Sequence, residues 1–153
     1  MKILDILDEE SIITELKSKS KKEAIEEMAV VAAKNDDSVN IETLVEVLIE
    51  REKLGSTGIG DGVAIPHGKL SSIENVMAVF ARSEEGIDFD SMDGKNAHLF
   101  FLLIAPEDSA GSHLKALARV SRLMNDPKFR LSLMEAKSRE EVYRTFADED
   151  AKY

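Results

Sequence analysis

The sequence Leu-Phe-Phe-Leu-Leu-Ile-Ala, residues 99–105, is the longest uninterrupted apolar run in the chain. A helix that spans a membrane needs about 20 apolar residues, so this run is too short to form one. Continuous hydrophobicity over such a length is typical of a strand that is buried on both faces. We therefore predict a sheet with residues 99–105 as its central strand, and no segment inserted into a membrane.

Shorter apolar segments predict the other strands. We expect strands at residues 63–65 and 76–81, and a short edge strand at residues 12–14. The segments Glu-Glu-Gly at 84–86 and Met-Asp-Gly-Lys at 92–95 are typical of turns, because glycine and aspartate favour turn conformations. These turns would separate the strands in the middle of the chain.

Polar side chains ahead of apolar segments predict where the helices begin, since their oxygens can accept hydrogen bonds from the first backbone N–H groups. Apolar residues at three- and four-residue spacing then continue each helix. The charged tail, residues 148–153, is expected to fray. The expected helices are about 21–34 after Ser20, about 41–52 after Asn40, one from His113 after Ser112, about 127–136 after Asp126, and about 139–146 after Ser138.

Strands are thus concentrated in the middle of the chain and helices at both ends. This distribution predicts one α/β (α+β-like) domain over residues 1–153, with helices covering a small sheet. A length of 153 residues and an apolar content of 43% agree with one domain that has a sizeable core.

The charge and the missing residue types exclude several functions. The net charge is −10 and tryptophan is absent, so DNA and RNA are poor partners for this surface. The chain has no cysteine, which removes disulfides, thiolate metal sites and cysteine nucleophiles. Residues 2–10, KILDILDEE, lack the pattern of a secretory signal. We expect a cytoplasmic protein that does not bind nucleic acid.

The strongest candidate for a functional site is the stretch REKLGSTGIGDGVAIPHGKL, residues 51–70. Closely spaced glycines predict a loop whose backbone N–H groups can point at an anion. Arg51 is expected in the last helical turn before this loop, and Pro66 fixes the backbone just before His67. The candidate phosphate-binding residues of the loop are Gly55, Ser56, Thr57, Gly58 and Gly60.

The chain has three histidines, and their surroundings differ. His98 begins the predicted central strand, which favours a structural, partly buried role. His113 follows the expected N-cap Ser112, so it is either a solvent-facing residue of the first turn or a site residue beside free N–H groups that attract phosphate. His67 is either an incidental residue after a glycine-rich turn or a candidate for phosphate chemistry.

Several common sites do not fit these residues. GSTGIG lacks the Gly-Lys-Ser/Thr of a P-loop and does not match a dinucleotide-binding motif, and no Gly-x-Ser-x-Gly elbow is present. The spacing of the three histidines is not diagnostic of zinc, so we expect neither a metal nor a diffusible cofactor. The remaining hypothesis is a histidine that accepts a phosphoryl group. Imidazole is nucleophilic when neutral, and its ordinary pKa of about 6.5 leaves much of it neutral in the cell.

At this point the sequence resembles a known family. Residues 51–69 are similar to the active-site signature of the enzyme IIA domains of the phosphotransferase system, in the fructose, mannitol and nitrogen-regulatory class. Residues 86–94, 97–106 and 112–119 are similar to the same family, so the resemblance covers nearly the whole chain. It implies a phosphotransferase whose mixed sheet of about five strands is sandwiched by helices.

The resemblance also implies roles for three residues. His67 would be the phosphorylated nucleophile, and His113 would contact the phosphoryl group without carrying it. Arg51 would help to hold the phosphate or the geometry of the site. The implied donor is phospho-HPr or its nitrogen-branch counterpart.

Two interpretations of the subtype stay open. Gly68 directly after the histidine, and a chain without fused IIB or IIC segments, favour a nitrogen-regulatory protein whose phosphorylation changes its affinity for a regulatory target. The alternative is a sugar-specific component of the fructose or mannitol type, which passes the phosphoryl group to a cysteine of a IIB domain for sugar uptake. We favour the nitrogen-regulatory type; the sequence does not indicate a sugar, a target or an oligomeric state.

Overall fold

The apolar run forms the central strand β6 (Ala97–Pro106) of one mixed, six-stranded sheet. The computed structural model describes residues 1–153. The strands follow the order β1-β5-β6-β3-β2, and β4 pairs with β6 further along the same edge as β3. The other strands are β1 (Ile12–Ile13), β2 (Gly58–Gly60), β3 (Val63–Ala64), β4 (His67–Leu70) and β5 (Met77–Ile87).

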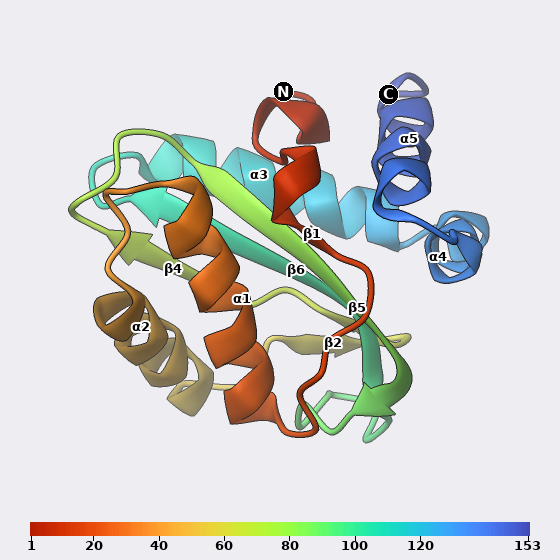
Figure 1. Ribbon diagram of the computed structural model, residues 1–153, viewed down its shortest axis with the longest axis horizontal. Coiled ribbons are helices and arrows are strands. Elements are labelled where there is room, and N and C mark those ends of the chain that lie inside the picture. Colours follow the sequence, from red (N-terminus) through yellow and green to blue (C-terminus); the bar gives the residue numbers. More distant parts are fainter.

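Helices cover both faces of this sheet (Figure 1). Residues of α1 (Lys21–Asn35) and α2 (Ile41–Lys53) share one buried cluster with Phe100, Leu102 and Ile104 of β6. Residues of α3 (Ala110–Met124), α4 (Pro127–Glu135) and α5 (Arg139–Asp150) share a second cluster with the alternate β6 residues Leu99, Phe101 and Leu103. Because successive side chains of a strand point to opposite faces, this one strand supplies both cores. The prediction of a small mixed sheet sandwiched by helices is confirmed.

Most of the expected helix starts are also confirmed. The side chains of Ser20, Asn40, Asp126 and Ser138 each accept a hydrogen bond from a backbone N–H of the helix that follows. Pro127 occupies the first helical position after Asp126, where its missing N–H costs nothing. None of the helices is both long and apolar enough to cross a lipid bilayer.

The start of α3 differs from the prediction. The helix begins at Ala110, because the N–H of His113 already donates to the carbonyl of Ser109 at 3.0 Å. Ser109, and not Ser112, is therefore the N-cap residue, although its hydroxyl donates to the Pro106 carbonyl instead of capping the helix. His113 accordingly lies about one turn inside α3, and it is buried where the prediction left solvent exposure open.

The prediction of a turn at residues 84–86 was also wrong. Strand β5 continues through these residues, with an irregular register between Arg82 and Ile87. Gly86 absorbs the irregularity with a φ of +87°, and the ring of His98 packs so closely against it that a Cβ would lie 2.7 Å from Cε1. The irregularity behaves as a bulge inside a long strand. His98, whose Nδ1 lies 3.0 Å from the Ser83 carbonyl, has the structural role that was predicted.

The tail does not fray at residue 148, because α5 continues to Asp150 and that residue is buried. The Asp150 carboxylate accepts hydrogen bonds from the backbone N–H groups of Ile3 and Leu4, at 3.0 and 3.1 Å. It also pairs with Arg119 of α3 at 2.9 Å. The two chain ends, which lie on the same side of the molecule, are thereby joined (Figure 1).

We predict that Asp150→Asn lowers the free energy of unfolding by about 3 kcal/mol, since it leaves the buried Arg119 guanidinium without its counter-ion. Chemical denaturation of both proteins measures the difference. Asp148→Asn is the matched control, because Asp148 belongs to the same helix and is exposed. Equal stability of Asp150→Asn and the unmodified protein would contradict this account of the tail.

Candidate functional site

His67 is the first residue of β4, and a backbone carbonyl fixes the orientation of its ring. Its Nδ1 lies 2.8 Å from the carbonyl oxygen of Ile65. A carbonyl can only accept a hydrogen bond, so Nδ1 carries the proton in the neutral ring. The lone pair of the imidazole is therefore on Nε2, the atom that points into the site.

Arg51 contacts this Nε2 atom from the last turn of α2. Its Nε donates to Nε2 of His67 at 3.2 Å, and its Nη1 donates to the carbonyl of Gly55 at 2.8 Å. The second hydrogen bond anchors the guanidinium on the glycine-rich loop. The first holds the imidazole by its lone pair and favours the neutral ring.

His113 approaches the same ring from α3. The ring centroids of His67 and His113 are 5.5 Å apart, with the planes inclined by 75°. His113 is only 7% exposed, and its Nε2 is buried without a hydrogen-bond partner. A buried polar atom without a partner loses hydration that nothing replaces, so this nitrogen is placed to bind a further group.

These three residues line one pocket of about 650 Å³. Lys69 also lines it, and the sequence did not identify this residue as part of the site. The alternation of β4 could have found it, because residues two apart on a strand share a face and His67 and Lys69 are so spaced. The complete lining is Val47, Glu50, Arg51, Leu54, His67, Gly68, Lys69, Ala110, His113, Leu114 and Leu117.

Burial lowers the pKa of both imidazoles, which favours their neutral forms. It is the largest of the effects on the pKa of His67, which lies below the ordinary 6.5. The hydrogen bond to the Ile65 carbonyl raises this pKa. The charge of Arg51 lowers it, and the charge of Glu52 raises it. Burial also lowers the pKa of His113, and the charges of His67 and Lys69 act in the same direction. A neutral His67 has its Nε2 lone pair available, which is the state that a nucleophile requires.

The glycine-rich loop residues Gly55, Ser56, Thr57, Gly58 and Gly60 do not line this pocket, and their phosphate-binding role stays a prediction. Three of its N–H groups have acceptors within the protein: Gly55 donates to the Glu52 carbonyl, Thr57 to the Glu52 side chain and Gly58 to the Ser56 hydroxyl. Gly60, with a φ of +98°, is in strand β2. The contact that the loop makes with the residues of the pocket is the Gly55 carbonyl, which accepts from Arg51.

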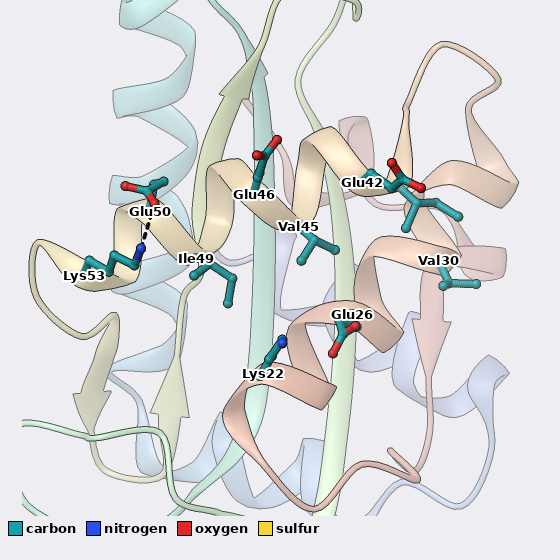
Figure 2. Close-up of a pocket in the computed structure, with 10 residues that line it drawn as sticks. Lys22, Glu26, Val30, Glu42, Val45, Glu46, Ile49, Glu50 and Lys53 are labelled. Carbon is teal, nitrogen blue, oxygen red and sulfur yellow. Dashed lines mark hydrogen bonds and ion pairs between the residues drawn. The ribbon is translucent and has the colours of Figure 1, made fainter.

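A second pocket of about 650 Å³ lies between α1 and α2 (Figure 2). Its lining includes the carboxylates Glu26, Glu42, Glu46 and Glu50, and it holds no histidine. Glu50 pairs with Lys53 at 2.9 Å in this view. An acidic hollow without a histidine is a poor candidate for phosphate, so the pocket that contains His67 is the candidate site.

Comparison with known proteins identifies the family of the chain. Residues 5–149 match the family model described as the phosphoenolpyruvate-dependent sugar phosphotransferase system, EIIA 2. The chain belongs to this EIIA family. The match spans every helix and strand that contributes to the pocket.

Relatives of two kinds occur among the EIIA proteins. A nitrogen regulatory protein of Bradyrhizobium diazoefficiens is 45% identical over 147 residues, which are 96% of this chain and 95% of the relative. The fructose-specific EIIABC component of Bacillus subtilis is 39% identical over 142 residues, which are 93% of this chain and 22% of that protein. The crystal structure of the nitrogen regulatory protein IIA-Ntr from Neisseria meningitidis has a TM-score of 0.87 and 37% identity, covering 93% of this chain and 97% of that one.

We predict that Arg51→Gln raises the pKa of His67. The positive charge of Arg51 and its hydrogen bond to the lone pair both favour the neutral ring. The substitution removes both of these interactions, so the charged ring becomes easier to form. An NMR titration of the histidine ring signals measures the change. The ring signals of His98, which is held by Ser83 outside the pocket, should be the same in both proteins. An unchanged or lowered pKa of His67 would contradict the contact with Arg51.

Proposed function

We propose that this EIIA chain is a phosphoryl carrier of the nitrogen-regulatory type, which accepts a phosphoryl group on Nε2 of His67. The observation that carries the proposal is the fixed tautomer of that ring. Its Nδ1 proton is committed to the Ile65 carbonyl, so Nε2 has the lone pair at the wall of the pocket. The proposed donor is phospho-HPr or its nitrogen-branch counterpart.

In the proposed transfer, the lone pair of Nε2 attacks the phosphorus of the donor. The new N–P bond forms as the bond between phosphorus and the donor breaks, and the donor keeps that electron pair. Both nitrogens of His67 are then substituted, and positive charge develops on the ring. The Ile65 carbonyl, which accepts from Nδ1–H, stabilises this charge, and no proton has to leave the ring.

The neighbouring groups are suited to the phosphoryl oxygens. The Arg51 N–H that meets Nε2 before the reaction has to release the lone pair, and a phosphoryl oxygen is its next acceptor. Nε2 of His113 has no partner within the protein and is suited to donate to a second oxygen. Lys69 adds a cation to the lining. These groups offset the charge of about −2 that the phosphoryl group brings.

An apolar rim around the pocket supports docking of a partner protein. Leu54 and Leu114 are 85% and 67% exposed, and both line the pocket that contains His67. Exposed leucines that gather at one site are typical of a protein interface. The donor carrier and the acceptor, a IIB domain or a regulatory target, would use this rim in turn.

We predict that His67→Ala abolishes phosphoryl acceptance and leaves the fold intact, because the half-buried ring makes no contact that the sheet requires. Incubation with the phosphorylated donor, followed by mass detection of phosphohistidine, measures acceptance. Circular dichroism and the melting temperature report the fold. Acid-labile phosphate on a folded His67→Ala protein would contradict the assignment.

His113→Ala separates the acceptor from its neighbour. The loss of one preorganised donor should slow transfer roughly 100-fold, while His67 still becomes labelled. His98→Gln is the matched control, since it removes a histidine outside the pocket and should leave the rate unchanged. Complete loss of labelling in folded His113→Ala would make His113 the acceptor or an essential base.

Similarity to a named relative supports the nitrogen-regulatory type. The Bradyrhizobium relative of that name is 45% identical over nearly its whole length. The fructose-specific relative keeps the sugar-transport alternative open, in which a IIB cysteine takes the phosphoryl group from His67.

We predict that the nitrogen-branch carrier phosphorylates this protein faster than phospho-HPr of the sugar branch does. The measurement is the initial rate of phosphohistidine formation with each donor at equal concentration. A second measurement is the rate at which the phosphorylated protein then transfers the group to a sugar-specific IIB domain. Preference for HPr together with rapid transfer to IIB would establish the sugar-transport alternative.

A further inference from the structure

A buried carboxylate lies next to Arg51 in the sequence and joins three segments of the chain. The side chain of Glu52, at the end of α2, is only 5% exposed. It pairs with Lys21 of α1 at 2.9 Å and accepts a hydrogen bond from the backbone N–H of Thr57 at 3.0 Å. The hydroxyl of Thr57 donates to its second oxygen. The carboxylate thus connects α1, α2 and the glycine-rich loop.

This arrangement closes the loop around Gly55. The backbone of Glu52 accepts from the N–H of Gly55 at 3.1 Å, and its side chain accepts from Thr57. Gly55 has a φ of +145°, a conformation that suits glycine and turns its carbonyl toward Arg51. The carbonyl that holds the Arg51 guanidinium is therefore part of a loop whose two sides are both fixed by Glu52.

The far side of the loop is anchored as well. The Ser56 hydroxyl donates to the Phe89 carbonyl at 2.6 Å. Lys21, the partner of Glu52, lies 4.9 Å from the centroid of the Phe89 ring. The cation and the hydroxyl thus fasten the loop to the segment after β5. Such a network leaves the Gly55 carbonyl little freedom to move.

We infer that Glu52 is a positioning residue for the phosphoryl site: through Thr57 and the loop it fixes the Gly55 carbonyl, which aims Arg51 at His67. The inference rests on the proposed function and adds a residue that lies outside the pocket lining. The glycine-rich motif acts by orienting a cation and not by binding phosphate with its own amides.

A double-mutant cycle tests the inference. Glu52→Gln should slow phosphoryl acceptance about ten-fold, because Arg51 loses its fixed orientation. In an Arg51→Gln background the same substitution should change the rate less than two-fold, since no guanidinium remains to be positioned. A merely structural role would slow both backgrounds by the same factor. That result would overturn the inference.

Glu46→Gln is the matched control for charge. Glu46 is on the same helix, is exposed, lines the hollow between α1 and α2 (Figure 2), and makes none of the contacts of Glu52. This variant should retain the full rate. A loss equal to that of Glu52→Gln would mean that the net charge of α2 matters and its buried carboxylate does not.

A milder pair of variants covers the case in which Glu52→Gln does not fold. Thr57→Val removes the hydroxyl and keeps the shape, whereas Thr57→Ser keeps the hydroxyl that donates to Glu52. We expect Thr57→Val to slow acceptance and Thr57→Ser to restore most of the rate. Equal rates for the two variants would overturn the role of this contact.

A readout without phosphoryl transfer separates this inference from the proposed function. The Nε–H signal of Arg51 in NMR spectra of the unphosphorylated protein reports its hydrogen bond to His67. We expect the signal to be protected from exchange in the unmodified protein and to lose that protection in Glu52→Gln and Thr57→Val. Full protection in both variants would overturn the inference. A protein that accepts no phosphoryl group at all would overturn the proposed function alone.

Discussion

The pairing of residues 63–70 with β6 is the constraint on which the site depends. Strands β3 and β4 keep one register against β6, with Val63 opposite Leu99 and His67 opposite Leu103. Between them, Ile65 donates its N–H away from β6, to the Thr57 carbonyl. In extended backbone the carbonyl of a residue points the same way as its N–H, so the Ile65 oxygen is available to the His67 ring. The direction of the Ile65 carbonyl therefore sets the tautomer of His67, the proposed nucleophile.

The glycine-rich loop shows how an apparent anion site can act indirectly. Loops of this composition bind phosphate when their N–H groups converge on it. Here those of Gly55, Thr57 and Gly58 have acceptors within the protein, and the carbonyl of Gly55 is the group that faces the site. A carbonyl repels an anion but holds a guanidinium, so by our inference this loop would act through the cation that it orients.

Local features of the fold could be predicted from the sequence, and long-range ones could not. Caps and apolar spacing identified the helices, and hydrophobicity alone identified β6 as central. The burial of Asp150 could not be foreseen, because its partners Ile3, Leu4 and Arg119 are distant in sequence. The earlier start of α3 was missed because its N-cap serine makes no capping bond.

The residues of the site could be predicted from the sequence, but the contacts between them could not. A resemblance to the EIIA family, more than spacing, brought Arg51 and His113 to His67, and the structure has the three together, while their roles stay predictions. Burial would also make the charge of His113 depend on whether the site carries a phosphoryl group. Burial lowers the pKa of His113 in the unphosphorylated pocket, and a phosphoryl dianion beside that ring would raise this pKa and make the ring a better donor. In the proposed transfer the ring and the phosphoryl group would stabilise each other, so the desolvation that favours a neutral His67 beforehand would also strengthen binding of the phosphoryl group afterwards.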